Sequence, residues 1–405
     1  MARGWLLGAV LLSLPGAGMA DCTYAVKAHL YRAATWDNEF GRLDESIQAI
    51  RDLGFPCIAT GFEWQPSKPP GNDRWKGNFA TVVRKLNRNG IAILGQIGNN
   101  ARWIRRSDLA KWKGWLGNVF KKYPTIRTWE ILNEINIDNF WPRQFTVNDY
   151  GDLLSDALQV SRGRGLITAG LARNGRRDAF LDMLMGKGYL NRVQGVGLHT
   201  YGLKGGQLLD YAEQIESRFR SRTGREHPIW ITEYGWSTPG GQRKVQPPKH
   251  QRGSIQEQRD YLLQALLITS YSPQIANLTV FELRDDSIRS GFGLYDIDFN
   301  IKPAGQAVRV FMDYLRDLPL DLLYRNGSQI AFKLRKTEPL LRYIAWGPKA
   351  IGRVNRRAAG LSAHVLRRSR LHKLTGKASK TDVIFWLDCN SPKGSGLRNI
   401  GGCNT

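Results

Sequence analysis

Eight short apolar runs alternate with stretches of helical periodicity between residues 24 and 318, and this order constrains the fold more than any other feature. The runs, which we predict to be strands, cover residues 24–30, 56–62, 91–97, 128–133, 166–171, 193–199, 229–233 and 278–283. The predicted helices include residues 43–53, 79–87, 109–122, 150–162, 208–220, 255–270 and 303–318. Repeated strand–helix units predict an α/β fold with parallel strands, a (β/α)8 TIM barrel. An open doubly wound sheet is the alternative, because strand number alone does not establish closure.

The pattern changes after residue 318. Three further runs, residues 329–334, 341–346 and 383–387, are predicted strands separated by basic turns that contain glycine. We therefore expect a catalytic barrel over residues 21–318 and a small β-rich C-terminal module over residues 319–405.

This C-terminal module holds most of the basic charge. Residues 321–405 contain 17 Lys and Arg and 4 Asp and Glu, so 17 − 4 = +13 of the chain's net +24 lies there. A solvated basic face is the simplest interpretation, and attraction to an anionic polymer or envelope surface is the more specific one. We recognise no nucleic-acid-binding motif and expect no nucleic-acid partner. The basic residues include Arg353, Arg356, Arg357, Arg367, Arg368, Arg370, Lys373, Lys377 and Lys380.

The first 20 residues have the features of a secretory signal peptide. Arg3 precedes an apolar segment, and Gly18-Met19-Ala20 supplies the small residues of a cleavage site. No later apolar run is long enough to span a bilayer, so we expect the mature chain to be secreted or periplasmic, without a transmembrane segment.

Four cysteines in an exported chain suggest two disulfides, for which three pairings are possible. Cys22 precedes the first predicted strand and Cys57 lies at the start of the second. Neighbouring parallel strands begin side by side, so these two could bridge at the closed end of the barrel. Cys389 and Cys403 would then pair. No cysteine has metal-ligand spacing with a histidine, so we expect no metal, and nothing in the sequence implies a cofactor.

Two predicted strands have a glutamate at, or directly after, their carboxyl end. Residues 128–136 (TWEILNEIN) and 228–236 (PIWITEYGW) each begin as an apolar run, and they place Glu134 and Glu233 at the carboxyl ends of strands four and seven. In a TIM barrel the active site lies at these ends.

Alternation along the seventh strand makes a further prediction. Ile229, Ile231 and Glu233 should point to one side of the sheet, and Trp230 and Thr232 to the other.

Other polar residues fall near the same ends. His199 and Tyr201 follow strand six two positions apart, so an extended chain would direct both to one side. Glu282 lies in strand eight. Glu130, four residues before Glu134 on the same strand face, should lie deeper, and we predict a structural ion pair for it. Asp285 and Asp286 follow strand eight, where they would cap the loop.

Glycoside hydrolysis requires this type of carboxylate pair. One carboxylic acid protonates the leaving oxygen, and one carboxylate acts from the other face of the sugar, at about 5–5.5 Å for direct attack or about 6.5–9.5 Å when a water intervenes. Strands four and seven lie across the barrel mouth from each other, so Glu134 and Glu233 could flank a sugar. The alternative is that both are solvated or salt-bridged loop residues.

The motifs around these glutamates resemble those of the clan A glycoside hydrolases, which are retaining (β/α)8 enzymes. The resemblance is strongest in residues 128–136 and 229–238 and extends through most of residues 24–318. It is closest to families 39 and 5. It includes the turn Trp64…Pro66…Gly71, the sequence Gly291-Phe292-Gly293-Leu294-Tyr295-Asp296 and the later Lys302-Pro303-Ala304.

The resemblance implies a role for each site residue. Glu134 would be the acid/base and Glu233 the nucleophile. Asn133 would bind the sugar hydroxyl next to the reacting carbon, Tyr201 would hydrogen-bond the nucleophile, and His199 would line the pocket. Glu134 must start protonated and Glu233 ionised. Two nearby carboxylates tend to adopt such different protonation states, because both cannot easily be ionised.

Three positions depart from the family pattern. Ala59 stands where many relatives have an arginine on strand two, near Asn133 and the nucleophile. Ile135 follows Glu134 where proline is common. Phe281 and Glu282 occupy the part of strand eight that often carries a substrate-stacking tryptophan.

Several tryptophans follow or lie near predicted strand ends. Aromatic faces stack on the apolar patches of sugar rings, and we expect at least two of these residues to form such platforms, although each could equally belong to the core. They are Trp36, Trp64, Trp103, Trp141 and Trp236.

The sequence therefore predicts an exported retaining glycoside hydrolase that cleaves β-glycosidic bonds in a polysaccharide, with an acidic exopolysaccharide or cell-envelope glycan among the candidates. A non-catalytic carbohydrate-binding or polysaccharide-assembly protein on the same barrel is the main alternative. An envelope protein with a purely electrostatic role is a third hypothesis, which predicts salt-sensitive binding to anionic polymer.

Overall fold

A computed structural model represents the chain. It describes residues 22–32, 39–64, 74–98, 104–174, 176–239, 247–285, 291–334, 341–359, 361–367, 370–379, 381–387 and 389. The predicted signal peptide lies outside these residues. Among the helices described, none combines the length and the apolar character needed to cross a membrane.

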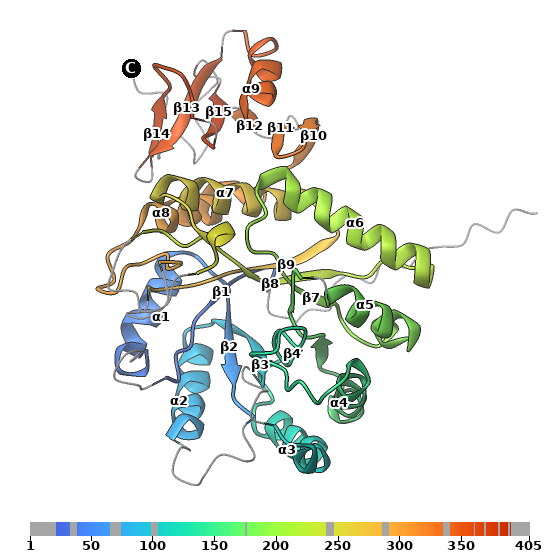
Figure 1. The fold of residues 1–405 in the computed structure, drawn as a ribbon. Coiled ribbons are helices and arrows are strands. Elements are labelled where there is room, and N and C mark those ends of the chain that lie inside the picture. The colour runs from blue at the N-terminus through green and yellow to red at the C-terminus, as the bar shows by residue number, and fades with distance from the viewer. Residues whose placement is uncertain are drawn as a thin grey trace, which may run out of the picture.

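The larger sheet is parallel and curls around the centre of the molecule (Figure 1). Its strands are hydrogen-bonded in the order β5-β4-β3-β2-β1-β9-β8-β7-β6. Seven of the eight predicted strands appear as single strands with shifted bounds. The strands are β1 (Tyr24–Lys27), β2 (Cys57–Phe62), β3 (Ala92–Ile97), β4 (Thr128–Ile131), β5 (Gly165–Ile167), β6 (Leu171–Ala172), β7 (Val196–His199), β8 (Ile229–Tyr234) and β9 (Ile275–Val280).

The predicted strand at 166–171 is broken into two strands, β5 and β6. These two strands lie at the two edges of the sheet, and the chain between them joins the edges. β5 pairs with β4 and β6 pairs with β7. Single bridges continue the pairing across the break, between Ile167 and Gly195 and between Asn133 and Gly170. The sheet is therefore closed, and the open doubly wound alternative is wrong.

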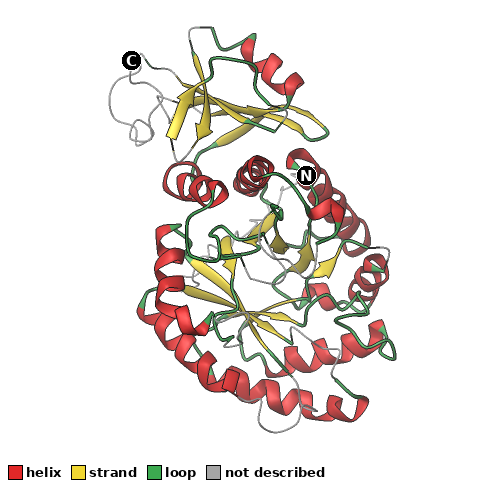
Figure 2. Ribbon diagram, turned by 60° about the vertical axis from the view of Figure 1, so that its left-hand side comes forward, coloured by secondary structure: helices red, strands yellow, loops and turns green. Residues whose placement is uncertain are grey.

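Helices surround this sheet (Figure 2). Their order follows the predicted alternation, and α5 is a helix that the predicted ranges did not include. The last predicted helix, 303–318, is α-helical only to Val310 and continues as one π-helical stretch, Phe311–Leu315. The helices are α1 (Leu43–Asp52), α2 (Arg74–Arg88), α3 (Leu109–Lys122), α4 (Val147–Val160), α5 (Arg177–Gly186), α6 (Gly205–Thr223), α7 (Ile255–Tyr271) and α8 (Pro303–Val310).

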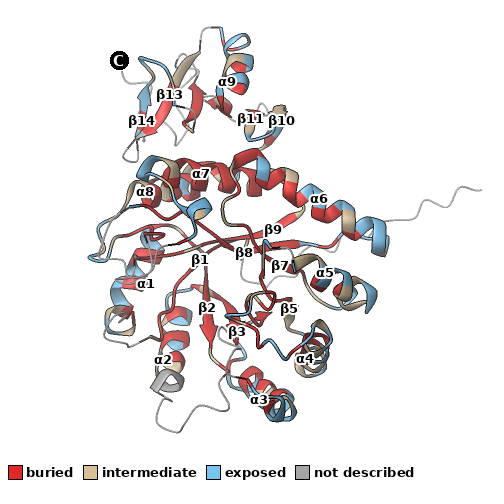
Figure 3. Cartoon of the chain, in the orientation of Figure 1, coloured by how far each residue is buried: buried red, intermediate tan, exposed pale blue. Residues whose placement is uncertain are grey.

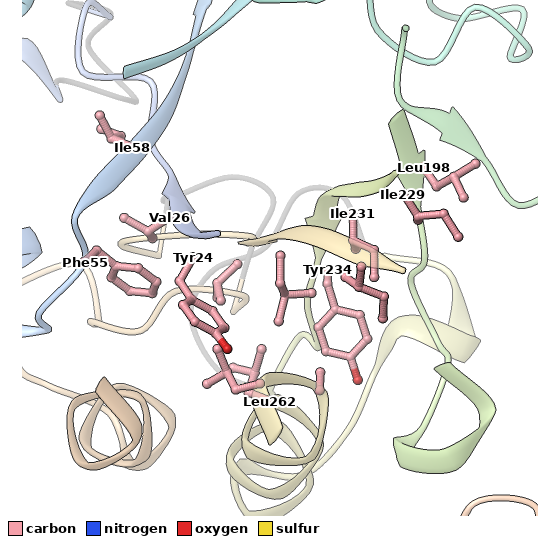
Figure 4. Packing of buried hydrophobic residues seen from close by; sticks show 14 of the residues in the cluster. Tyr24, Val26, Phe55, Ile58, Leu198, Ile229, Ile231, Tyr234 and Leu262 are labelled. Carbon is pink, nitrogen blue, oxygen red and sulfur yellow. The ribbon is translucent and has the colours of Figure 1, made fainter. Parts of the chain in front are cut away.

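Alternate strand residues divide between two apolar layers. Val26, Ile229 and Ile231 belong to one large hydrophobic cluster that also contains Leu262 of α7 (Figure 4). The strands are almost wholly buried (Figure 3), because one face meets helices and the other fills the barrel.

The barrel interior begins with a small apolar cluster at its closed end. This cluster includes Ala25, Ala59 and Trp230 together with the disulfide Cys22–Cys57, whose Cα atoms are 5.1 Å apart. The predicted pairing of these two cysteines is confirmed. Cys389 is disulfide-bonded, and its predicted partner Cys403 lies outside the described residues.

A second sheet forms the β-rich C-terminal module (Figure 1). All its pairings are antiparallel, and the three strands predicted there are confirmed. The module contacts α7 through a buried ion pair between Arg259 and Asp382 and through the Gln264 amide, which donates to the Thr381 carbonyl. Its elements are β10 (Leu320–Asn326), β11 (Gln329–Leu334), β12 (Leu341–Trp346), α9 (Pro348–Asn355), β13 (Ser362–Arg367), β14 (Arg370–Lys373) and β15 (Val383–Leu387).

Candidate active site

Glu134 reaches the barrel mouth because the chain turns sharply where β4 ends. Leu132 and Glu134 have φ values of 70° and 43°, in a region that non-glycine residues adopt at a cost and that is often found at functional sites. The Glu134 amide donates to the Gly170 carbonyl at 3.0 Å. This bond fixes the turn against the β5–β6 break.

Glu233 reaches the same place because β8 is irregular. The register of β8 shifts against β7 at Leu198/His199 and against β9 between Ile231 and Tyr234. Such a shift redirects a side chain. Thr232 and Glu233 both enter one polar cluster, where Thr232 donates to Glu130 and Glu233 accepts from Tyr201. The prediction that they point to opposite faces is wrong.

The two glutamates lie close together, with His199 between them. One carboxylate oxygen of Glu134, one of Glu233 and a ring nitrogen of His199 lie within 4.8 Å of one another. His199 Nδ1 is 2.8 Å from Glu134 Oε1 and 3.4 Å from Glu233 Oε2. The Tyr201 hydroxyl donates to Glu233 Oε2 at 2.8 Å. The two carboxylates therefore face one shared space.

Both glutamates are mostly enclosed, and their neighbours are charged. Burial opposes protonation of His199, but Glu233, the hydrogen bond to Glu134 and nearby Glu130 outweigh it and raise the His199 pKa to about 9. Burial and the adjacent carboxylates raise the pKa of Tyr201 well above its usual value. At neutral pH the site therefore holds an imidazolium and a neutral phenol, both donors toward the carboxylates.

A layer of buried polar residues lies beneath the pair; Glu130 was expected at this depth, whereas Lys27 and Gln96 were not predicted. Lys27 Nζ donates to Gln96 Oε1 at 2.5 Å, and Gln96 Nε2 donates to Glu130 Oε2 at 2.9 Å and to Asn133 Oδ1 at 2.8 Å. Lys27, Gln96 and Glu130 occupy inward positions of β1, β3 and β4. Polar residues at inward positions of otherwise apolar strands were the sequence signal for this layer.

Glu130 differs from its prediction as a simple ion-pair partner. Its carboxylate accepts hydrogen bonds from Gln96 and from Thr232, at 2.9 and 2.8 Å. Burial raises its pKa, while nearby Lys27 and His199 act in the opposite direction. It therefore belongs to a shared network in which two cations serve several acids.

Gly170 makes room for this arrangement. A Cβ at this position would lie 2.1 Å from His199 Nε2 and 2.6 Å from Glu130 Oε1, distances that packed atoms do not adopt. Only glycine lets the β5–β6 break approach the imidazole so closely.

The tryptophans occupy different places. Trp36 and Trp103 lie outside the described residues. Trp64, Trp141 and Trp236 are 2 %, 2 % and 3 % exposed and pack against other aromatic rings in the core. A sugar could stack on these three only if the surrounding packing opened.

Phe281 and Glu282, which follow β9 and depart from the family pattern, both lie close to the site. Phe281 packs edge-on against Tyr201 at 5.9 Å between ring centroids, and Phe292 does so at 5.7 Å. These rings hold the phenol beside Glu233. Glu282 is buried and lines a small pocket with Lys27, His29 and Arg284. Asp285 pairs with Lys302 and accepts from the Gly293 amide; Asp286 lies outside the described residues.

Glu134, His199 and Glu233 are also the described residues that could coordinate a metal ion. Coordination requires a neutral imidazole. The His199 pKa of about 9 keeps the ring protonated at neutral pH, so a metal would have to displace that proton.

Protein stability should depend on the His199 charge. Its pKa of about 9 in the folded chain exceeds the ordinary 6.5, so the stabilisation is complete below pH 6.5 and is lost as pH rises through 9. Since ten-fold in affinity for a proton is about 1.4 kcal/mol, we expect a loss of about 3 kcal/mol across this window. Urea unfolding at several pH values measures the free energy of unfolding. Subtracting the pH profile of His199→Gln removes the contribution of other titrating groups. Parallel profiles for the two proteins would contradict the expectation.

Comparisons with known proteins agree with the fold. No protein-family model matches the chain, and no curated protein matches its sequence. Among solved structures, a family 39 glycoside hydrolase from Bacteroides cellulosilyticus WH2 matches with a TM-score of 0.62 and 16% identity, over 91% of this chain and 79% of its own.

Two family 30 structures also match. The subfamily 8 xylanase Xyn30A from Clostridium acetobutylicum has a TM-score of 0.53 at 11% identity, over 91% of this chain and 96% of its own. The catalytic domain of xylanase C from Talaromyces cellulolyticus has a TM-score of 0.52 at 8% identity, over 91% and 94%. The predicted resemblance to clan A glycoside hydrolases is thereby confirmed at the level of fold.

Proposed function

We propose that this protein is an exported retaining glycoside hydrolase that cleaves β-glycosidic bonds in a polysaccharide by double displacement. The observation that supports it most is that a carboxylate oxygen of Glu134 and one of Glu233 lie within 4.8 Å of each other. The fold shared with glycoside hydrolases of families 39 and 30 agrees with this.

In the first step Glu233 attacks the anomeric carbon and Glu134 gives its proton to the departing glycosidic oxygen. The bond to the leaving sugar breaks as the bond to the Glu233 oxygen forms. In the second step Glu134 takes a proton from water, whose oxygen attacks the anomeric carbon and releases Glu233. Two inversions leave the configuration at that carbon unchanged.

The neighbouring groups suit these roles. The Tyr201 hydroxyl donates to Glu233 Oε2 and steadies its charge before attack. His199 Nδ1 lies 2.8 Å from Glu134 Oε1 and holds this carboxyl group in place at the barrel mouth. Asn133 would bind the hydroxyl beside the reacting carbon, with its own Oδ1 held by Gln96.

The proposal extends to location and substrate. The disulfide Cys22–Cys57 favours an oxidising compartment. Exposed basic side chains on the C-terminal module would draw an anionic polymer towards the barrel. They include Arg353, Arg356, Arg357, Arg370, Lys373 and Lys377.

A panel of neutral and acidic β-linked polysaccharides, with products identified by mass spectrometry, tests this function. We expect new reducing ends, a retained anomer in proton NMR, and labelling of Glu233 by a fluoro-sugar or cyclophellitol probe. Affinity for acidic members should fall with added salt. Inversion would contradict the mechanism. Glycan binding with neither cleavage nor labelling would instead support the non-catalytic carbohydrate-binding alternative.

A further inference from the structure

We infer that Lys27 is a positioning residue that keeps the nucleophile Glu233 ionised and sets the orientation of Asn133. This inference rests on the proposed function of the site. Ala59, the neighbour of Lys27 on β2, carries no charge. Lys27 therefore supplies a positive charge from β1 instead.

Lys27 is a fully buried lysine inside the barrel, with 0% exposure. Alternation along β1 directs Ala25 and Lys27 inward, and Lys27 lies directly beside Ala59 of β2 in the parallel register. A buried ammonium group is unfavourable unless an anion or strong acceptor compensates it. The groups that contact the Lys27 ammonium therefore indicate its role.

Those contacts lead to the nucleophile. Lys27 Nζ lies 3.7 Å from Glu233 Oε1. The other oxygen, Oε2, accepts from Tyr201 at 2.8 Å and lies 3.4 Å from His199 Nδ1. The two oxygens are thus supported from different strands, with a cation near each. An ionised Glu233 is favoured by both.

A second contact extends the effect to Asn133. Because Lys27 has only donors, it fixes Oε1 of Gln96 as the acceptor and turns Nε2 towards Asn133 Oδ1, at 2.8 Å. The Asn133 oxygen is then occupied, and its NH2 group remains as the donor for a sugar hydroxyl. Lys27 shares this task with Glu130, whose Oε2 accepts from the same Gln96 Nε2 at 2.9 Å.

The charges around Glu233 make the loss of Lys27 consequential. The cations are Lys27 and His199. The acids facing the same space are Glu130 and Glu134, with Glu282 near Tyr201. Removing Lys27 leaves one cation among these acids, which favours protonation of Glu233.

The test compares Lys27→Met, Lys27→Arg and a matched control, Lys302→Met, which removes a mostly buried lysine that pairs with Asp285 instead. Glutamate labelled with carbon-13 at the side-chain carboxyl carbon lets NMR follow the ionisation of Glu233. The Glu233 signal is identified as the one that is missing from the spectrum of Glu233→Gln. We expect the Glu233 titration midpoint in Lys27→Met to rise by about one pH unit or more, as an opposite charge at this distance implies. The acidic limb of probe labelling should move by the same amount. Lys27→Arg and Lys302→Met should titrate like the parent chain.

A folded Lys27→Met protein whose Glu233 titrates like the parent chain would overturn the inference, since a merely structural lysine predicts that result. If Lys27→Met does not fold, Lys27→Gln removes the charge while keeping a donor for Gln96 and is judged by the same criterion. NMR titration needs no substrate, so its outcome is separate from that of the proposed function. Failure of the parent chain to label or cleave would count against the function alone.

Discussion

Glu233→Gln should lower turnover of a cleavable β-glycan by about 10⁴-fold or more, because the amide cannot form the covalent glycosyl intermediate. Glutamine has nearly the same shape and can still accept from the Tyr201 hydroxyl, which lies 2.8 Å from Glu233 Oε2. The fold should therefore persist. Initial rates of reducing-end release, together with a circular dichroism spectrum, measure both effects.

A matched control for this substitution is Glu216→Gln. Glu216 is a buried glutamate of α6 that pairs with Arg220, away from the barrel mouth. It should retain parental activity. A Glu233→Gln protein that still turns over would remove the basis of the double-displacement mechanism, whatever the substrate.

Glu134→Ala should give the second largest loss, and its size should depend on the leaving group. For a glycan, whose alkoxide leaves only when protonated, we expect a loss of about 10²–10⁴-fold. An aryl glycoside with an acidic phenol needs little protonation, so formation of the glycosyl intermediate should be nearly as fast as in the parent chain. The intermediate should then accumulate, because water lacks its base.

Added azide distinguishes this role from a structural one. Azide attacks without losing a proton, so it should restore turnover of the aryl glycoside and give a glycosyl azide of retained configuration. Product NMR and mass spectrometry identify it. If azide gives no rescue in folded Glu134→Ala, or gives the inverted product, then Glu134 is not the acid/base of a retaining enzyme.

Much of the architecture follows from periodicity. The apolar runs that end at Ile97 and Ile131 are strands because both of their faces are buried, one by helices and one by the barrel filling. The predicted run 166–171 was harder, because Gly170 permits a break that a hydrophobic pattern does not reveal. At that break the Glu134 amide donates to the Gly170 carbonyl, and the His199 ring lies close against Gly170.

The tryptophans show the limit of inference from position along the chain. Nearness to a strand end does not distinguish a ring that faces the mouth from one that packs behind it. Trp64, for example, packs with Trp112 and Trp115, partners that come from α3, distant in sequence.

By itself the sequence determined the succession of strands and helices and the two glutamates at strand ends, because burial and strand ends leave a local pattern. It left three cysteine pairings possible, of which the structure contains Cys22–Cys57. Only the tertiary structure decided how the site is assembled. The irregular register of β8 brings Glu233 to the same side as Thr232, and closure of the barrel sets Lys27 of β1 against Glu233 of β8. These contacts join residues far apart in the chain, so no local pattern encodes them.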